Sequence, residues 1–219
     1  MMPTKVVFWG AGGHAIVCAE ILSAMGDHEL AGCLEDSACK ESGHPALKTS
    51  VVGTREHLPD LQRAGVRHAF VAIGDCLARL RIAKMFTSAG FTLVSLVHPR
   101  AVVSASAAVG EGTVLMAGAI VNAHANIGAN VILNTACSVD HDCQVSDGVH
   151  ISPGAHLAGR VKIGTGTWVG LGASVCGRVE IGSHSIVGAG AVVIEDIPAN
   201  VVVVGVPARI IRKIEDAQP

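Results

Sequence analysis

The sequence predicts a small α/β domain with a parallel sheet over residues 1–97, a prism of very short parallel strands over residues 98–200, and a tail over residues 201–219. In the first part, apolar segments of strand and helix character alternate, which is typical of a parallel sheet with covering helices. In the second part, a large aliphatic residue recurs every six positions without a slip, and a small or β-branched residue follows each one by four positions. A fixed period of this kind indicates a repeat architecture.

The elements of the first part follow from its apolar pattern. The segments that predict strands cover residues 5–10, 30–36, 68–74 and 92–99, and those that predict helices cover residues 14–26 and 77–90. The second helix is expected to end at Gly90, because glycine favours the left-handed conformation that closes a helix. The stretch from Ser37 to Ser50 has no periodicity, so we expect a loop there.

The six-residue repeat predicts which side chains fill the prism. The aliphatic series spans residues 109–193 and the small series spans residues 113–191, and both are expected to point inward. Three faces of six residues close one turn, so residues eighteen apart lie one above the other at the sheet spacing of about 4.8 Å. Glycines that follow the aliphatic residue, such as Gly164 and Gly182, are expected to relieve the corners by adopting a positive φ.

Composition and charge limit the classes of partner. The formal net charge of -2 provides no polycationic surface, so we expect no nucleic-acid partner. The sequence has no run of apolar residues long enough to span a bilayer and begins without a signal-like segment, so we expect no membrane association. Seven cysteines without CxxC spacing favour a reducing compartment, which predicts a cytoplasmic protein.

The stretch VDHDC is unusually polar for this repeat. In the six-residue repeat, Val139 and Cys143 occupy inward positions, so His141 and Asp142 are expected to point outward. One coil beyond His141 lies Gly159, and the next coil has Gly177, so the surface beside the histidine lacks side chains and a thin ligand could lie against exposed backbone there. Two interpretations of Asp142 remain open: it supports the imidazole, or it forms an ion pair with Arg160 on the next coil.

The stretch GAGGHA at residues 10–15 follows a predicted strand and opens a predicted helix. It fits G-x-G-x-x-[GA], and Glu35 and Asp36 end the next strand. Glycines here let the backbone approach a pyrophosphate at the helix N-terminus. Taken alone, this pattern predicts a dinucleotide site, but the segment before the repeat holds only part of a dinucleotide fold.

The order of these motifs resembles the bacterial nucleotide-sugar acetyltransferases with hexapeptide repeats, over nearly the whole chain. The resemblance rests on WGAGGHA, LED, VAIGD and HP, followed by NT, VDHDC and GVPAR. It implies a Rossmann-like domain and a left-handed parallel β-helix. Members of the family N-acetylate 4-amino-4,6-dideoxyhexoses linked to UDP, GDP or dTDP. The resemblance therefore implies an acetyl-CoA-dependent N-acetyltransferase of surface glycan (lipopolysaccharide) biosynthesis. O-acetylation of a sialic-acid-like sugar is the alternative.

The resemblance also implies catalytic roles. His141 becomes the general base and Asp142 the acid that raises its basicity, in a direct attack without an acyl-enzyme. An imidazole suits this task because its pKa lies near the working pH. The backbone N–H of Gly159 is a candidate donor to the oxyanion. Cys137 and Cys143 fall at inward positions, so we interpret them as core thiols.

Further ligand contacts are implied by the same resemblance. The nucleotide-sugar would contact Gly12, Gly13, His14, Glu35, Asp36, Gly74, Asp75 and Arg79, with Asn134 near the sugar. Acetyl-CoA would contact His150, Gly159, Leu171 and Ala189 in a groove between two prisms of a homotrimer. Structural alternatives are a capped surface histidine at His150 and a polar ladder at Asn134. Outward apolar residues also favour a trimer interface: Val114, Ile120, Ile132 and Trp168.

Two further function classes are alternatives for this sequence. Some hexapeptide-repeat proteins are zinc carbonic anhydrases, and this chain has four histidines within the repeat region: His124, His141, His150 and His156. Zinc catalysis needs three convergent ligands and an open position. These histidines lack the spacing of those enzymes, so no metal is expected. A non-catalytic nucleotide-sugar-binding protein is the other alternative, and thioester turnover would distinguish it from an enzyme.

Overall fold

The computed structural model of the protein describes residues 3–36, 47 and 51–215. The chain divides into two compact units, Met1–Pro99 and Arg100–Pro219. The expected loop from Ser37 to Ser50 lies, apart from Leu47, outside the described residues. Within the described ranges, no helix has the length and apolar character that a membrane span requires.

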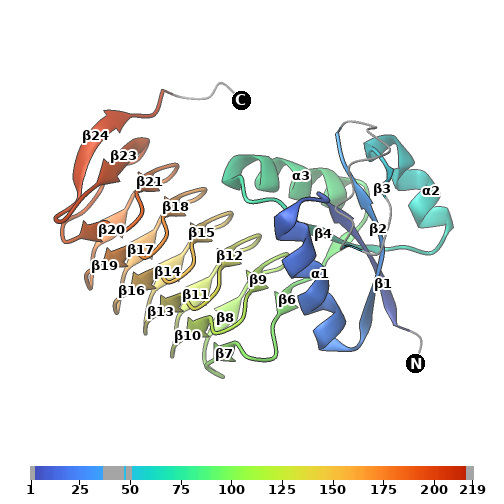
Figure 1. The fold of residues 1–219 in the computed structure, drawn as a ribbon, viewed down its shortest axis with the longest axis horizontal. Coiled ribbons are helices and arrows are strands. Elements are labelled where there is room, and N and C mark those ends of the chain that lie inside the picture. The colour runs from blue at the N-terminus through green and yellow to red at the C-terminus, as the bar shows by residue number, and fades with distance from the viewer. Residues whose placement is uncertain (1–2, 37–46, 48–50, 216–219) are drawn as a thin grey trace. The chain divides into compact units, whose positions relative to one another are not determined.

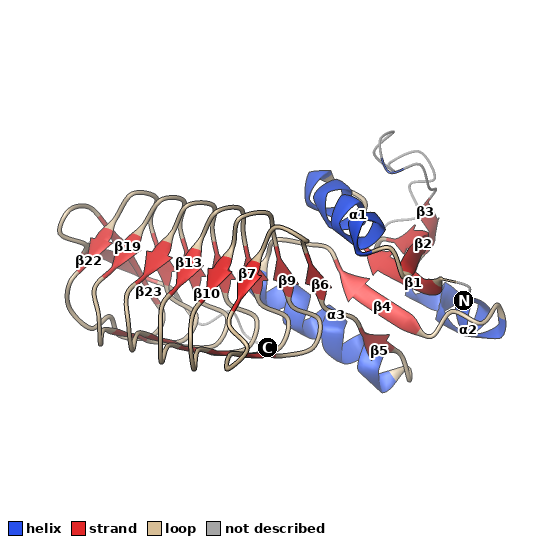
Figure 2. Ribbon diagram, turned by 90° about the horizontal axis from the view of Figure 1, so that it is seen from below, coloured by secondary structure: helices blue, strands red, loops and turns tan. Residues whose placement is uncertain are grey.

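The first unit is built on a parallel sheet with the strand order β3-β2-β1-β4-β5 (Figure 1). Its strands are β1 (Thr4–Trp9), β2 (His28–Leu34), β3 (Val51–Gly53), β4 (His68–Val71), β5 (Thr92–Leu93) and a separate β6 (Leu96–Val97). Its helices are α1 (Gly13–Met25), α2 (Leu58–Arg63) and α3 (Cys76–Ser88), with a 3-10 turn η2 (Arg55–His57). Figure 2 shows α1 on one face of the sheet and α2 and α3 on the other.

Strand β1 forms the middle of this unit because its last four residues are fully apolar and buried. It pairs in parallel with both β2 and β4, as expected for a strand covered on two faces. The predicted strand over residues 92–99 is instead two short strands, β5 and β6. Strand β3, η2 and α2 were not predicted, because elements of three to six residues are too short to show a periodic pattern.

The second unit is a prism in which two-residue strands stack in parallel in three sheets, with two longer strands, β23 and β24, at the C-terminal end (Figure 2). One sheet holds β7 (Val102–Val103), β10 (Ile120–Val121), β13 (Ser138–Val139), β16 (His156–Leu157), β19 (Ser174–Val175) and β22 (Val192–Val193). The next holds β8 (Ala108–Val109), β11 (Asn126–Ile127), β14 (Gln144–Val145), β17 (Lys162–Ile163) and β20 (Glu180–Ile181). The third holds β9 (Val114–Leu115), β12 (Ile132–Leu133), β15 (His150–Ile151), β18 (Trp168–Val169), β21 (Ile186–Val187), β23 (Val201–Val204) and the antiparallel β24 (Arg209–Lys213).

Strand register confirms the eighteen-residue coil. Ile132 pairs with His150 and His150 pairs with Trp168, one above the other along the prism. The aliphatic series from Leu115 to Val193 and the small series from Thr113 to Ala191 are buried throughout. The two threonines of the small series also point inward, and their hydroxyls donate to main-chain carbonyls: Thr113 to Gly128 at 2.9 Å and Thr167 to Gly182 at 2.8 Å. The predicted α/β domain followed by a left-handed parallel β-helix is therefore confirmed.

The expectation for the corner glycines was wrong. Gly164 and Gly182 do not have a positive φ; they are glycine because a Cβ would lie 2.4 Å from the Ser183 nitrogen and 2.3 Å from the Ala199 nitrogen on the adjacent coil. Positive φ occurs two positions later, at every sixth residue from Gly112 to Gly190. Several of those residues are not glycine, and they carry side chains at the edges of the prism.

Candidate active site

The candidate catalytic pair lies in the turn between β13 and β14. Asp142 adopts φ 60°, a left-handed conformation that aspartate tolerates better than most residues. Neighbouring side chains along an extended strand point in opposite directions, whereas this turn brings His141 and Asp142 together. His141 Nδ1 lies 2.8 Å from Asp142 Oδ2. The carboxylate therefore fixes the tautomer with hydrogen on Nδ1 and leaves the Nε2 lone pair available as a base.

The carboxylate of Asp142 is shared between two neighbours. Arg160 Nε approaches the same oxygen, Oδ2, at 3.5 Å, which is longer than the contact from His141. The hydrogen bond from His141 is the main reason that the pKa of Asp142 is lowered, and the charges of His141, Arg160 and His124 add to the effect. Asp142 is therefore ionised at neutral pH. Support of the imidazole and pairing with Arg160, which the sequence left as alternatives, occur together.

Gly159 lies against the reactive side of the imidazole. A Cβ on this residue would stand 2.6 Å from His141 Nε2, closer than any real contact, so only glycine lets the ring occupy this position. The two coils are also joined by a hydrogen bond from the Arg160 N–H to the His141 carbonyl, at 2.9 Å. The N–H of Gly159 has no hydrogen-bond acceptor among the described residues. It is thus a free donor on the surface next to the base.

A second group of side chains lies on a different edge of the prism, where Asn134 follows β12. Asn134 Nδ2 lies 3.1 Å from His150 Nε2, and the His150 ring stacks on Trp168 with a centroid distance of 5.5 Å and an interplanar angle of 2°. Trp168 Nε1 donates to Ser152 Oγ at 2.7 Å. This ring stack was not predicted, although the eighteen-residue spacing of His150 and Trp168 was a signal for it.

The proposed acetyl-CoA residues differ in exposure. His150 is only 8% exposed, because it is packed beneath its neighbours, whereas Leu171 is 58% exposed. Leu171 and Ala189 are eighteen residues apart, and both are exposed in turns that follow strands of the sheet containing β15. The structure therefore places these residues along one edge, and His141 and Gly159 along another.

The loop after β1 is open to a ligand. Gly12 is the N-cap of α1, and neither Gly12 nor Gly13 would place a Cβ within 4 Å of another atom. The N–H of Ala11 donates to Glu35 Oε1 at 3.1 Å, which holds the end of β2 beside this loop. Asp36 follows as an exposed residue. The loop lies at the carboxyl edge of the sheet, where the strand order reverses between β1 and β4, a usual ligand site in such folds.

The turn after β4 forms the other side of this edge. Asp75 caps α3 by accepting the Ala78 N–H at 2.7 Å, directly after Gly74. Arg79 is 1% exposed, and its Nη1 donates to the carbonyls of Gly74 at 2.9 Å and Ile73 at 3.2 Å. Its guanidinium therefore contacts the main chain of the turn and is withdrawn from the surface.

His14 lies in the first turn of α1. Its Nε2 is 3.7 Å from Cys18 Sγ. Burial, and then the charge of Arg79, lower the pKa of His14 to about 4. The imidazole is therefore neutral at physiological pH, so any contact it makes with a phosphate is a hydrogen bond rather than an ion pair.

The chemistry of the thiols and of metal ligands limits other mechanisms. Cys137 and Cys143 are completely buried; burial raises the pKa of both and brings that of Cys137 to about 12. Both are protonated core thiols at neutral pH, which argues against a nucleophilic cysteine. In the part of the chain that the structure describes, no three His, Cys, Asp or Glu side chains group in a way that could hold a metal.

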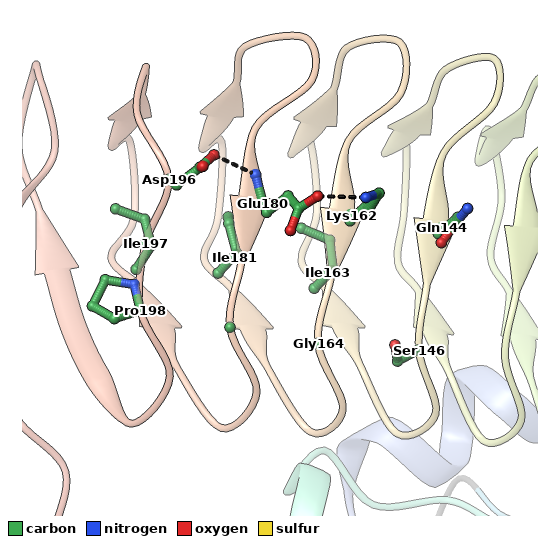
Figure 3. A pocket seen from close by; sticks show the side chains of 11 residues that line it. Gln144, Ser146, Lys162, Ile163, Gly164, Glu180, Ile181, Asp196, Ile197 and Pro198 are labelled. Carbon is green, nitrogen blue, oxygen red and sulfur yellow. Dashed lines mark hydrogen bonds and ion pairs between the residues drawn. The ribbon is translucent and has the colours of Figure 1, made fainter.

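A groove of about 570 Å³ follows the β14–β17–β20 face (Figure 3). It begins at Gln144, two residues after Asp142. Lys162 pairs with Glu180, and the main-chain N–H of Glu180 donates to Asp196 Oδ1 at 2.8 Å, so the three charged side chains along this face all have partners within it. None of the predicted site residues lines this groove.

Comparison with known proteins gives the family. The PglD N-terminal domain matches residues 5–86. A histidine-to-asparagine mutant of perosamine N-acetyltransferase from Caulobacter crescentus, solved with CoA and GDP-perosamine, is 42% identical with a TM-score of 0.90, over 94% of this chain and 96% of that one. The acetyltransferase domain of PglB from Neisseria gonorrhoeae, solved with acetyl coenzyme A, is 38% identical with a TM-score of 0.87, over 95% and 100% of the two chains.

A further relative is the UDP-N-acetylbacillosamine N-acetyltransferase of Bacillus subtilis, which is 42% identical over 117 residues. That alignment spans 52% of this chain and 51% of the Bacillus protein, about half of each. The two structural matches, in contrast, extend over both units of the fold. The chain therefore belongs to the PglD-like family of sugar N-acetyltransferases.

Proposed function

We propose that the protein transfers the acetyl group of acetyl-CoA to the 4-amino group of a nucleotide-linked 4-amino-4,6-dideoxy sugar. The observation that carries this proposal is the position of His141 Nε2, a free base that faces the bare surface of Gly159 while Nδ1 is held by Asp142. A thioester lying on that surface would place its carbonyl carbon next to both the base and a free N–H donor.

In the proposed reaction, the sugar amine attacks the thioester carbonyl directly. His141 Nε2 takes the proton that the nitrogen loses as the C–N bond forms, and Asp142 stabilises the resulting imidazolium. The N–H of Gly159 stabilises the oxyanion of the tetrahedral intermediate. The intermediate then expels the CoA thiolate, which takes up a proton. No covalent enzyme intermediate is needed.

The first unit would hold the nucleotide of the substrate. The open loop at Gly12 and Gly13 offers backbone N–H groups to a diphosphate, with His14, Glu35 and the turn at Asp75 around it. A relative supports a nucleotide-sugar as the substrate class, because the Caulobacter protein has been solved with CoA and GDP-perosamine. We place the reaction in the cytoplasm, as a step of surface glycan biosynthesis. The cysteines of the described residues are free thiols, which fits a reducing compartment.

Turnover with nucleotide-linked amino sugars tests the function. With acetyl-CoA and UDP-, GDP- or dTDP-linked 4-amino-4,6-dideoxyhexoses, we expect release of free thiol and one product heavier by one acetyl group, with the acetyl on nitrogen. Mass spectrometry and NMR identify the product. Acetylation of a sialic-acid hydroxyl in place of the amine would favour the alternative activity. Tight binding of NAD without binding of any of these nucleotide-sugars would reassign the first unit.

We also propose a homotrimer with a composite site. The two groups of site residues, His141 with Gly159 and Asn134 with His150, lie on different edges of one prism, so neighbouring prisms would bring them together. Among the apolar residues expected at the interface, Ile120 and Trp168 are 38% and 44% exposed. Val114 and Ile132 are buried within the single chain and are therefore not available for an interface.

Light scattering should give a mass three times the 22.3 kDa of the chain at micromolar concentration. Mixing separately inactive His141→Ala and His150→Ala chains under conditions that exchange subunits should restore activity at about a quarter of the interfaces, where both intact residues meet. A stable monomer with full activity would refute the composite site. Mixed chains that remain inactive, despite proven exchange, would place both histidines within one subunit's site.

A further inference from the structure

A column of titratable side chains runs through the turn that carries the proposed base. Asp142 lies between His124 on the preceding coil and Arg160 on the following one, each separated by eighteen residues. These three residues share the left-handed backbone conformation, with φ of 59°, 60° and 64°, so the three side chains leave the prism from the same turn position. His141 adjoins this column through Asp142.

The contacts show how the charge of Asp142 is divided. The same carboxylate oxygen, Oδ2, receives His141 Nδ1 at 2.8 Å and faces Arg160 Nε at 3.5 Å. The other neighbouring acid, Asp140, directs its Oδ1 to the His141 main-chain N–H at 2.7 Å and to Asn122 Nδ2 at 3.1 Å. Asp140 is thus engaged with amides, and Asp142 is the carboxylate that contacts the imidazole.

We propose that Arg160 is a positioning residue for the acetyl transfer: by sharing Asp142 Oδ2 with His141, it limits the hold of the carboxylate on the imidazole that acts as the base. This role rests on the proposed function, in which His141 is the base. Arg160 does not touch the reacting atoms; it acts through Asp142.

The proposed role of Arg160 follows from the chemistry of the His141–Asp142 pair. A carboxylate bound to an imidazole favours the imidazolium and raises its pKa. A general base that is already protonated cannot accept the proton of the amine, so too strong a partner lowers the fraction of active enzyme at neutral pH. A guanidinium on the same oxygen opposes this effect in two ways: it competes for the carboxylate, and it places a positive charge near the imidazole.

Both effects predict the same sign when Arg160 is removed. Arg160→Met should therefore move the titration of the His141 imidazole to higher pH, because Asp142 Oδ2 then contacts His141 alone. The methionine retains much of the aliphatic stem, so packing along the turn changes little. Arg178→Met is the matched control, because Arg178 has the same turn position one coil farther on, with φ 68°, and has no ion pair with a described residue.

The test is an NMR titration of histidine Cε1–H signals in the free protein, with the His141 signal assigned by its loss in His141→Ala. We expect the His141 pKa to rise in Arg160→Met, to stay at the wild-type value in Arg178→Met, and to shift less in Arg160→Lys, which keeps a charge. This measurement needs no turnover, so a protein without acetyltransferase activity would refute the proposed function and still report on Arg160.

Kinetics then connect the shift to catalysis. The acidic limb of kcat/KM against pH should move upward by the same amount in Arg160→Met and should not move in Arg178→Met. An unchanged or lowered His141 pKa in Arg160→Met would overturn the proposal. So would an equal rise in both variants, because it would show a general effect of surface charge. A change in melting temperature alone, with both pH profiles unmoved, would assign Arg160 a structural role.

Discussion

Replacing His141 with alanine is expected to lower kcat by about 10²- to 10⁴-fold, the usual contribution of a positioned general base. The KM values for acetyl-CoA and for the nucleotide-sugar should stay near those of the wild type, because the side chain is 50% exposed and supports neither the core nor the nucleotide loop. Steady-state kinetics with both substrates varied would measure the two effects separately.

Asp142→Asn is the informative companion to this variant. It removes the charge that stabilises the imidazolium but leaves the base in place, so kcat should fall less than in His141→Ala. If both variants instead retained wild-type kcat, the pair would have no catalytic role. A loss confined to the KM for acetyl-CoA would make His141 a binding residue.

Gly159→Val is expected to produce the second large loss. A side chain here must displace the imidazole, since even its Cβ would stand 2.6 Å from Nε2 and 2.7 Å from Cε1. The ring is half exposed and can rotate away, so the protein should fold while the base is misplaced. Misplacement of a catalytic group by about 1 Å can cost on the order of 10²-fold in rate, and the same side chain would cover the proposed thioester surface. We therefore expect a lower kcat together with a higher KM for acetyl-CoA.

Gly177→Ala provides the control for the displaced ring. It lies one coil farther along the same column, and its Cβ would meet the Gly159 carbonyl oxygen at 3.1 Å without reaching the imidazole. Its kcat should therefore remain close to the wild type. Circular dichroism and thermal melting confirm folding in both variants. Normal acetyl-CoA kinetics in folded Gly159→Val would show that the thioester lies elsewhere.

Much of the fold was predictable because the repeat imposes a strict period. The inward series appears in the sequence as an uninterrupted pattern, and its members are buried as expected except Val109, which is partly buried. The corner glycines were misinterpreted because glycine meets two different needs, a positive φ and the absence of a Cβ, and the sequence alone does not separate them. At Gly164 the backbone of the adjacent coil decides, and that distance depends on how the coils stack.

The candidate site was predictable where it depends on neighbours in the repeat. Eighteen-residue spacing placed Gly159 next to His141 and Arg160 next to Asp142, and the structure has both contacts. It did not reveal which ring nitrogen faces which partner, because that depends on rotamers. The burial of Arg79 was also not predictable, since an arginine in a helix of mixed polarity is more often exposed.

The most direct test of the central claim, that His141 is the base, is the pH dependence of kcat/KM for the nucleotide-sugar in wild type and His141→Ala. The account predicts an acidic limb in the wild type, which reports protonation of the His141 imidazole. It predicts that His141→Ala lacks this limb and stays well below the wild type at every pH. Recovery of His141→Ala to the wild-type kcat/KM at high pH would contradict it, because the amine would then arrive neutral and react without a base.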